Sequence, residues 1–243
     1  MRRIALAVCC LMLFATASLQ AGTITANFNS PVGNWGSATA TINGIGVHGY
    51  QYINNQWVDA NLFGRNQSND RGVGICSTAD GNNCGTGSGG GDYNELDNSG
   101  GAELIVLKLP DGYAWKSVQL SSLDKNDSTD PNQWERGVLK GSMTGDPNAS
   151  PAFTTLCDFV TGGAANNLCT IGTGFEPVLG LTGGTNNKYL YFTALDWQNN
   201  RNTNNDYLIY SATVTSVPEP GSMMLLGSGL AGVIGSVRRK LQK

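Results

Sequence analysis

The chain has 243 residues, a length that suits one large domain or two small ones. Only 14 % of the residues are charged, and 15 Lys and Arg nearly balance 18 Asp and Glu, which argues against a nucleic-acid-binding protein because phosphate contacts need a basic surface. The 33 glycines and 25 asparagines favour tight turns, so we expect many short strands and few long helices.

The first 21 residues have the features of a secretory signal peptide. Two arginines follow the initiating methionine, residues 4–14 form an unbroken apolar run, and residues 15–22 are mostly small. The apolar run is short for a membrane span. We expect signal cleavage after Ala17 or after Ala21, and favour Ala21.

Ten segments show the alternation, or the β-branched and aromatic enrichment, that is typical of strands. They are residues 23–28, 38–42, 47–53, 56–61, 103–109, 116–122, 137–143, 153–160, 188–195 and 207–215. The continuous apolar run 104–107 indicates a central strand covered on both faces. Asn-Asn and Gly-rich turns lie between the segments. Residues 22–216 are therefore predicted to fold as an all-β, antiparallel β-sandwich of the jelly-roll-like type.

Four cysteines remain once the signal peptide is removed. Three pairings are possible, and we favour Cys76–Cys84 and Cys157–Cys169 because each pair brackets a Gly- and Asn-rich loop. A zinc site is the less favoured alternative, since the sequence has no Cys-x-x-Cys and only one histidine.

Nothing in the sequence predicts a catalytic centre. His48 lies in a strand pattern with no nucleophile motif beside it, and a histidine there most often lines a sheet face. Before the last 27 residues the glutamates are Glu95, Glu103, Glu135 and Glu176, without an aromatic-flanked pair. We expect a protein that is not an enzyme, with a secreted glycan hydrolase as the less favoured alternative.

Two acidic segments could bind calcium. Oxygen-bearing residues in Asp124–Glu135 are spaced as in an EF-hand loop, but Thr129 occupies the position that needs glycine, so an EF-hand is rejected. The other segment contains Glu95 and Asp97. We keep the hypothesis of a structural calcium held by Glu95, Asp97 or Asp124, while two solvated loops are the preferred interpretation.

Four tryptophans lie beside Asn- and Gln-rich turns, where exposed rings could stack on sugars and nearby amides could bind hydroxyl groups. They are Trp35, Trp57, Trp134 and Trp197. Each could equally be a core residue near a strand end. Carbohydrate binding, with exopolysaccharide as the ligand, is therefore an alternative function.

The C-terminus has three parts. A Pro-Glu-Pro motif keeps the backbone extended, the uncharged stretch 221–237 is long enough for a single transmembrane helix, and a basic tail follows that is expected on the cytoplasmic side. The residues expected to carry this signal are Pro218, Glu219, Pro220, Arg238 and Arg239.

This tripartite end resembles the PEP-CTERM sorting signal of bacterial surface proteins. The resemblance implies an exosortase substrate of a Gram-negative bacterium that produces extracellular polysaccharide. It also implies passage through the inner membrane and a place at the cell surface or in the extracellular matrix. We accordingly divide the chain into a signal peptide (1–21), an ectodomain (22–216) and a sorting signal (217–243), and expect a structural or adhesive role.

Removing both ends changes the charge of what remains. Residues 22–216 contain 9 Lys and Arg against 17 Asp and Glu, a net charge of −8. The near neutrality of the whole chain thus comes from its basic targeting ends.

Overall fold

The computed structural model describes residues 22–68, 70–77, 95–97, 101–123, 136–160, 169–171, 176–181, 187–194 and 206–217, with residues 227, 229, 232, 234, 237 and 238. The chain divides into two compact units, which are described separately. One unit is Ile24–Val214, and the other combines the two chain ends, Met1–Thr23 and Thr215–Lys243.

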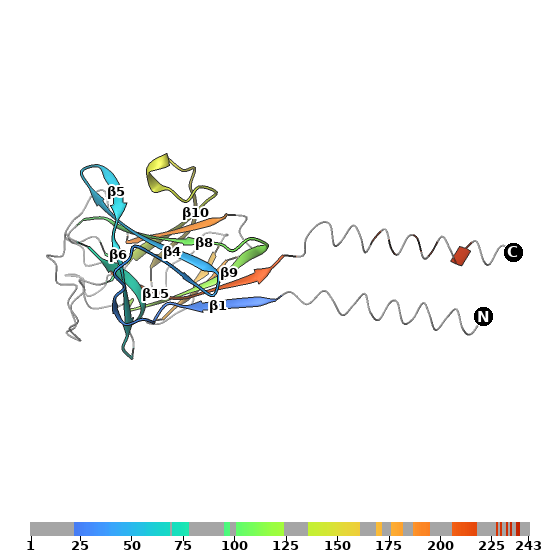
Figure 1. The fold of residues 1–243 in the computed structure, drawn as a ribbon, viewed down its shortest axis with the longest axis horizontal. Coiled ribbons are helices and arrows are strands. Elements are labelled where there is room, and N and C mark those ends of the chain that lie inside the picture. The colour runs from blue at the N-terminus through green and yellow to red at the C-terminus, as the bar shows by residue number, and fades with distance from the viewer. Residues whose placement is uncertain are drawn as a thin grey trace. The chain divides into compact units, whose positions relative to one another are not determined.

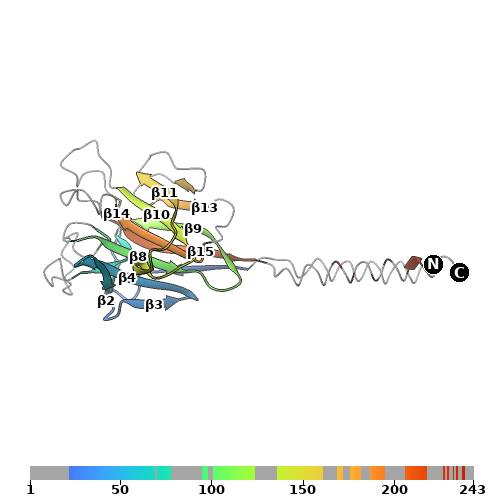
Figure 2. The ribbon, with the colours of Figure 1, turned by 90° about the horizontal axis from the view of Figure 1, so that it is seen from above.

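The described strands form two sheets, here called sheet A and sheet B (Figures 1 and 2). Sheet A has the order β12 (Cys169–Ile171), β13 (Val178–Leu181), β9 (Tyr113–Ser121), β15 (Leu208–Ser216), β7 (Arg71–Cys76), β6 (Asn61–Asn66) and β2 (Gly33–Asn34), and β1 (Thr23–Asn27) also pairs with β15. Sheet B has the order β11 (Thr154–Val160), β10 (Arg136–Ser142), β14 (Tyr189–Ala194), β8 (Glu103–Lys108), β4 (Ile45–Ile53) and β3 (Thr39–Ile42), and β5 (Gln56–Asp59) also pairs with β4. The strand pairs β10–β14, β8–β4 and β6–β7 are all antiparallel. The predicted all-β fold with two antiparallel sheets is confirmed.

The main core contains side chains from both sheets. Ile105 and Leu107 of β8 belong to this core, whereas Leu104 and Val106 belong to a second cluster on the opposite face of sheet B. All four are buried, which confirms that residues 104–107 form a strand covered on both faces. A continuous apolar run is the expected sequence of such a strand, because neither face meets water.

Asparagine turns set the register of two hairpins. Asn54 and Asn55 join β4 to β5 with φ angles of 52° and 64°. Asn43 and Gly44 join β3 to β4 with φ angles of 48° and 84°. Two successive positive φ angles are what a two-residue type I′ hairpin turn requires, and Asn and Gly adopt them most readily. These three asparagines thus form the turns of two hairpins.

The strands that the sequence did not predict are short or rich in glycine. In addition to β2, β12 and β13, these are β6 and β7, whose glycines interrupt the alternation. A Cβ on Gly64 would lie 2.6 Å from Nε1 of Trp35, and one on Gly72 would lie 2.5 Å from the carbonyl oxygen of Ile209. Glycine is needed at both sites because neighbouring groups approach the backbone closely.

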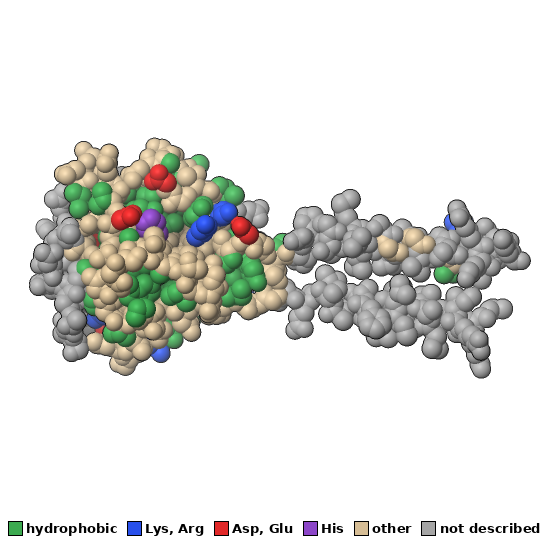
Figure 3. Space-filling view, viewed as in Figure 1, with side chains coloured by type: hydrophobic (Ala, Val, Ile, Leu, Met, Phe, Trp, Pro, Cys, Tyr) green, Lys and Arg blue, Asp and Glu red, His purple; other side chains and the backbone are tan. Residues whose placement is uncertain are grey.

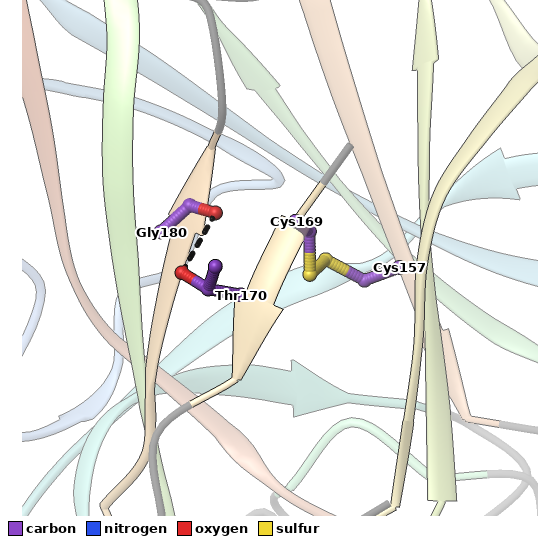
Figure 4. The surroundings of a disulfide bond; sticks show 4 residues. All are labelled: Cys157, Cys169, Thr170 and Gly180. Carbon is purple, nitrogen blue, oxygen red and sulfur yellow. Dashed lines mark hydrogen bonds between the residues drawn. A yellow bond between two sulfur atoms is a disulfide. The ribbon is translucent and has the colours of Figure 1, made fainter. Parts of the chain in front are cut away.

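A disulfide joins Cys157 of β11 to Cys169 of β12, with their Cα atoms 5.7 Å apart (Figure 4). These strands end sheet B and sheet A respectively, so the bond connects the two sheets. This pairing is the predicted one. Cys76 is also disulfide-bonded, but its predicted partner Cys84 lies outside the described residues.

The predicted targeting segments fall largely outside the described residues. The signal peptide 1–21 and the Pro-Glu-Pro motif are not described. The six described residues between 227 and 238 are helical. No helix among the described residues is long and apolar enough to span a membrane.

Replacing both Cys157 and Cys169 by alanine should lower the free energy of unfolding by about 3 kcal/mol, because the bond closes a loop across 12 residues. Urea unfolding of the mature chain and of the double variant measures the difference. Reducing agent should lower the wild-type value and have a smaller effect on the variant. Equal stabilities would show that the bond adds no stability.

Candidate functional sites

The first and last strands of the folded domain pair with each other. The backbone N–H of Gly22 donates to Oγ of Ser216, and the N–H of Ser216 donates to the carbonyl oxygen of Gly22, both at 2.8 Å. Further along, Oγ1 of Thr25 lies 3.1 Å from Oγ1 of Thr213. The numbering of these contacts shows that β1 and β15 run antiparallel (Figure 1).

The β1–β15 pairing reaches the last residue of β15. Ser216 ends the strand, and Val217 is half exposed immediately after it. Upstream, Ala212 and Val214 are fully buried in the main core. The residue that directly follows β15, Val217, is therefore exposed, and the predicted sorting motif Pro-Glu-Pro begins at the next residue.

The outer face of sheet B carries His48, whose two ring nitrogens are both engaged. Nε2 lies 2.8 Å from Oδ1 of Asp59, and Nδ1 lies 2.8 Å from the hydroxyl of Tyr50. The rings of His48 and Tyr50 stack with centroids 4.0 Å apart. Both contacts form when Nε2–H donates to Asp59 and the tyrosine hydroxyl donates to Nδ1. Figure 3 shows the histidine (purple) beside acidic side chains (red).

These contacts hold the ring of His48 in one orientation, with Nε2 toward Asp59 and Nδ1 toward Tyr50. Its one unprotonated nitrogen accepts a hydrogen bond from Tyr50, and burial, with the nearby Asp59 carboxylate, raises the pKa of Tyr50 to about 12. A tyrosine with such a pKa remains a donor at neutral pH. The three side chains connect β4 to β5.

The segment around the 3₁₀ turn η2 (Pro147–Ala149) covers aromatic side chains of the same face. The side chain of Asn148 bonds both the N–H and the carbonyl oxygen of Trp57, at 2.9 and 2.8 Å. The hydroxyl of Tyr191 donates to the carbonyl oxygen of Thr144, and the ring of Phe153 meets Tyr191 edge-on. This segment therefore contacts two aromatic residues of the outer face, Trp57 and Tyr191.

The two predicted tryptophans that the structure describes pack against different clusters. Trp35 packs against the main core, and its Nε1 donates to the carbonyl oxygen of Pro31 at 2.6 Å. Trp57 packs against the second cluster and is partly exposed, with its ring 5.1 Å from that of Tyr52. Trp134 and Trp197 lie outside the described residues. Trp57 is the described tryptophan that lies on the outer face of sheet B.

A buried ionic cluster lies at β6, β7 and the segment 95–97. The guanidinium of Arg65 donates to Oε1 of Glu95 and, at 3.1 Å, to Oδ2 of Asp70. The hydroxyl of Ser122 lies 3.0 Å from Oε1 of Glu95 and 3.0 Å from Oδ1 of Asp70. Burial raises the pKa of Glu95 well above its usual value, and the carboxylate of Asp206 raises it further, while Arg65 opposes this effect.

Two predicted calcium ligands belong to this region. Glu95 and Asp97 are each 3 % exposed, and Oε2 of Glu95 has no hydrogen-bond partner among the described residues. Asp124 lies outside those residues, although Ser122, two positions earlier, contacts Glu95. Within the described ranges no three His, Cys, Asp or Glu side chains are placed to hold a metal ion. Calcium binding stays a prediction.

Sequence reasoning missed the partners of these groups. Arg65 stands in a glycine-containing segment without clear alternation, and its partner Glu95 is 30 residues away. Asp59 was likewise not linked to His48. The local sequence gives no signal for the Arg65–Glu95 pair, because Arg65 stands between Gly64 and Asn66 and Glu95 follows Asn94.

Comparison with known families finds a match for the C-terminal residues of the chain. A model of the PEP-CTERM protein-sorting motif matches residues 216–240. The match begins at the last residue of β15. No curated protein and no solved structure matches the chain. The chain thus carries a PEP-CTERM sorting motif, which implies exosortase as its processing partner and export toward the cell surface.

Replacing Glu95 by glutamine should weaken the pH dependence of stability. The folded state raises the pKa of Glu95. The stability that protonated Glu95 contributes is therefore fully present below the pKa that Glu95 has in the unfolded chain. It is lost as the pH rises through the pKa that Glu95 has in the folded chain. Glutamine has a similar shape and does not titrate, so the variant lacks this contribution to the pH dependence. The groups that face Glu95 are Arg65, Asp70, Asp206 and Ser122.

The measurement is urea unfolding from pH 5 to pH 8. The wild-type midpoint should fall more steeply with rising pH than that of the Glu95→Gln variant. Glu176→Gln is the control, because Glu176 pairs with Arg71 and is more exposed. Parallel pH profiles for wild type and Glu95→Gln would contradict the assignment.

Proposed function

We propose that this chain is an exported, exosortase-processed protein of the cell surface or extracellular matrix, with a structural or adhesive role. The observation that carries the proposal is the position of the sorting motif, which starts where β15 ends. The folded domain is then the part delivered, and the C-terminal segment is the part that directs it. A signal peptide at residues 1–21 and a membrane helix at 221–237 belong to this proposal.

The disulfide chemistry supports a destination outside the cytoplasm. Cys157 and Cys169 are bonded to each other, and Cys76 is bonded as well. Such bonds persist in oxidising compartments and are rare in the cytosol. The domain also has neighbouring strands from distant parts of the chain, such as β7, β15 and β9, which supports a jelly-roll-like arrangement.

Two titratable side chains of the described residues have structural contacts. His48 has both ring nitrogens in hydrogen bonds. The acidic Glu95 is buried and held by Arg65 and Ser122. These contacts fit the structural role that we propose.

Replacing Pro218, Glu219 and Pro220 by alanine should abolish processing. We expect the variant to keep its C-terminal segment and remain in the membrane fraction, while the wild-type chain loses residues 221–243 and reaches the surface. Immunoblots of fractions with antibody to the domain measure this. Alanine at the exposed Val32 and Val178, which are 68 % and 45 % exposed, provides a control that should be processed normally.

Carbohydrate binding is the second candidate function. Trp57 favours it, because its partly exposed ring lies beside Tyr52 and on the same strand as the exposed Asp59. A ring for stacking with nearby carboxylate and aromatic groups is a common way to bind sugars.

Trp57→Ala should reduce retention on the producer's exopolysaccharide at least several-fold in a pull-down with the mature protein. The control is Val58→Ala, since Val58 is also exposed on β5. Equal retention of both variants and the wild type would exclude Trp57 as a sugar contact, and no retention of the wild type would exclude this ligand.

A further inference from the structure

The pairing of β1 with β15 joins residues from opposite ends of the chain. Gly22 and Ser216, which bond each other, are 194 positions apart. β15 also lies between β9 and β7 in sheet A. Sheet A is therefore incomplete until the residues up to Ser216 have left the membrane during export.

No spacer separates this last strand from the sorting motif. The motif match starts at residue 216, and four residues lie between Ser216 and Gly221, where the uncharged stretch begins. Even fully extended, the chain from Ser216 to Gly221 covers only about 17 Å. While the uncharged stretch is in the membrane, the end of β15 therefore lies within about 17 Å of Gly221.

The pairing also limits which backbone groups an enzyme can reach. An enzyme that binds a peptide in extended form uses the peptide's free N–H and C=O groups. The N–H of Ser216 already donates to Gly22, whereas Val217 follows the pairing and is half exposed. Binding upstream of Val217 would require β15 to leave sheet A, which would expose the buried Ala212 and Val214.

We propose that β1 and β15 pair before the sorting cleavage, and that this pairing prevents cleavage at any bond before Ser216. Gly22 and Ser216 act as positioning residues. The processing enzyme then cuts an already folded domain at a bond beyond Ser216. This inference rests on the proposed function, because it concerns the same cleavage.

The pairing has a second consequence at the other end of the chain. Signal cleavage after Ala21 makes the backbone nitrogen of Gly22 the mature amino terminus, and that nitrogen donates to Oγ of Ser216. The two ends produced by processing are then neighbours, where β1 begins and β15 ends. Cleavage after Ala17 would instead leave four residues before Gly22.

A disulfide between β1 and β15 tests the order of events. Oγ1 of Thr25 and Oγ1 of Thr213 are 3.1 Å apart, so Thr25→Cys with Thr213→Cys places two thiols in contact. The double substitution is made in the full chain, in the wild-type background and in the background with alanine at Pro218, Glu219 and Pro220. Each single cysteine variant is the control.

We expect the disulfide to form in the uncleaved alanine background, and the doubly substituted wild-type chain to be cleaved to the same C-terminal residue as the single-cysteine controls, with a yield within about twofold. Mass spectrometry reads the bond and the terminus. Free thiols in the uncleaved chain, loss of cleavage in the disulfide-bonded chain alone, or a terminus upstream of Ser216 would each overturn the inference. Failure of the wild-type chain to be cleaved at all would instead overturn the proposed function.

Discussion

The hydrogen bonds between β1 and β15 are the interaction on which the rest of the structure depends. They connect the two ends of a chain of short strands, and they hold the strand that lies between β9 and β7. The buried Ala212 and Val214 anchor this strand in the main core. Because the sorting motif follows β15 without a spacer, the same strand connects the fold to its targeting.

The central strand of sheet B, β8, is covered on both faces, whereas β3 and β5 are largely exposed. Strand β8 contributes to the main core and to the second cluster, and the segment around η2 contacts Trp57 and Tyr191 on the outer face. On the outer face of sheet B, the exposed Asp59 lies against His48. A ligand of the outer face would therefore meet the β4–β5 hairpin.

Strands with clear alternation or β-branched residues, such as β4, β8 and β15, could be predicted from the sequence, because their apolar residues face a core. β6 and β7 could not be predicted. Glycine is needed at Gly64 and Gly72 because groups from distant parts of the chain lie close to the backbone there, and the local sequence does not show this. The Cys157–Cys169 pairing followed from spacing, but spacing could not reveal that the bond joins two sheets. The partners of Arg65 and His48 likewise depend on which strands become neighbours.

The intact mass of the protein taken from the cell surface tests the central claim most directly. A folded domain that is cut just after β15 should have its C-terminus between residues 217 and 220, with Gly22 as its first residue. A surface protein that still carries the basic tail after residue 237 would contradict the account, because sorting would then leave the C-terminal segment in place.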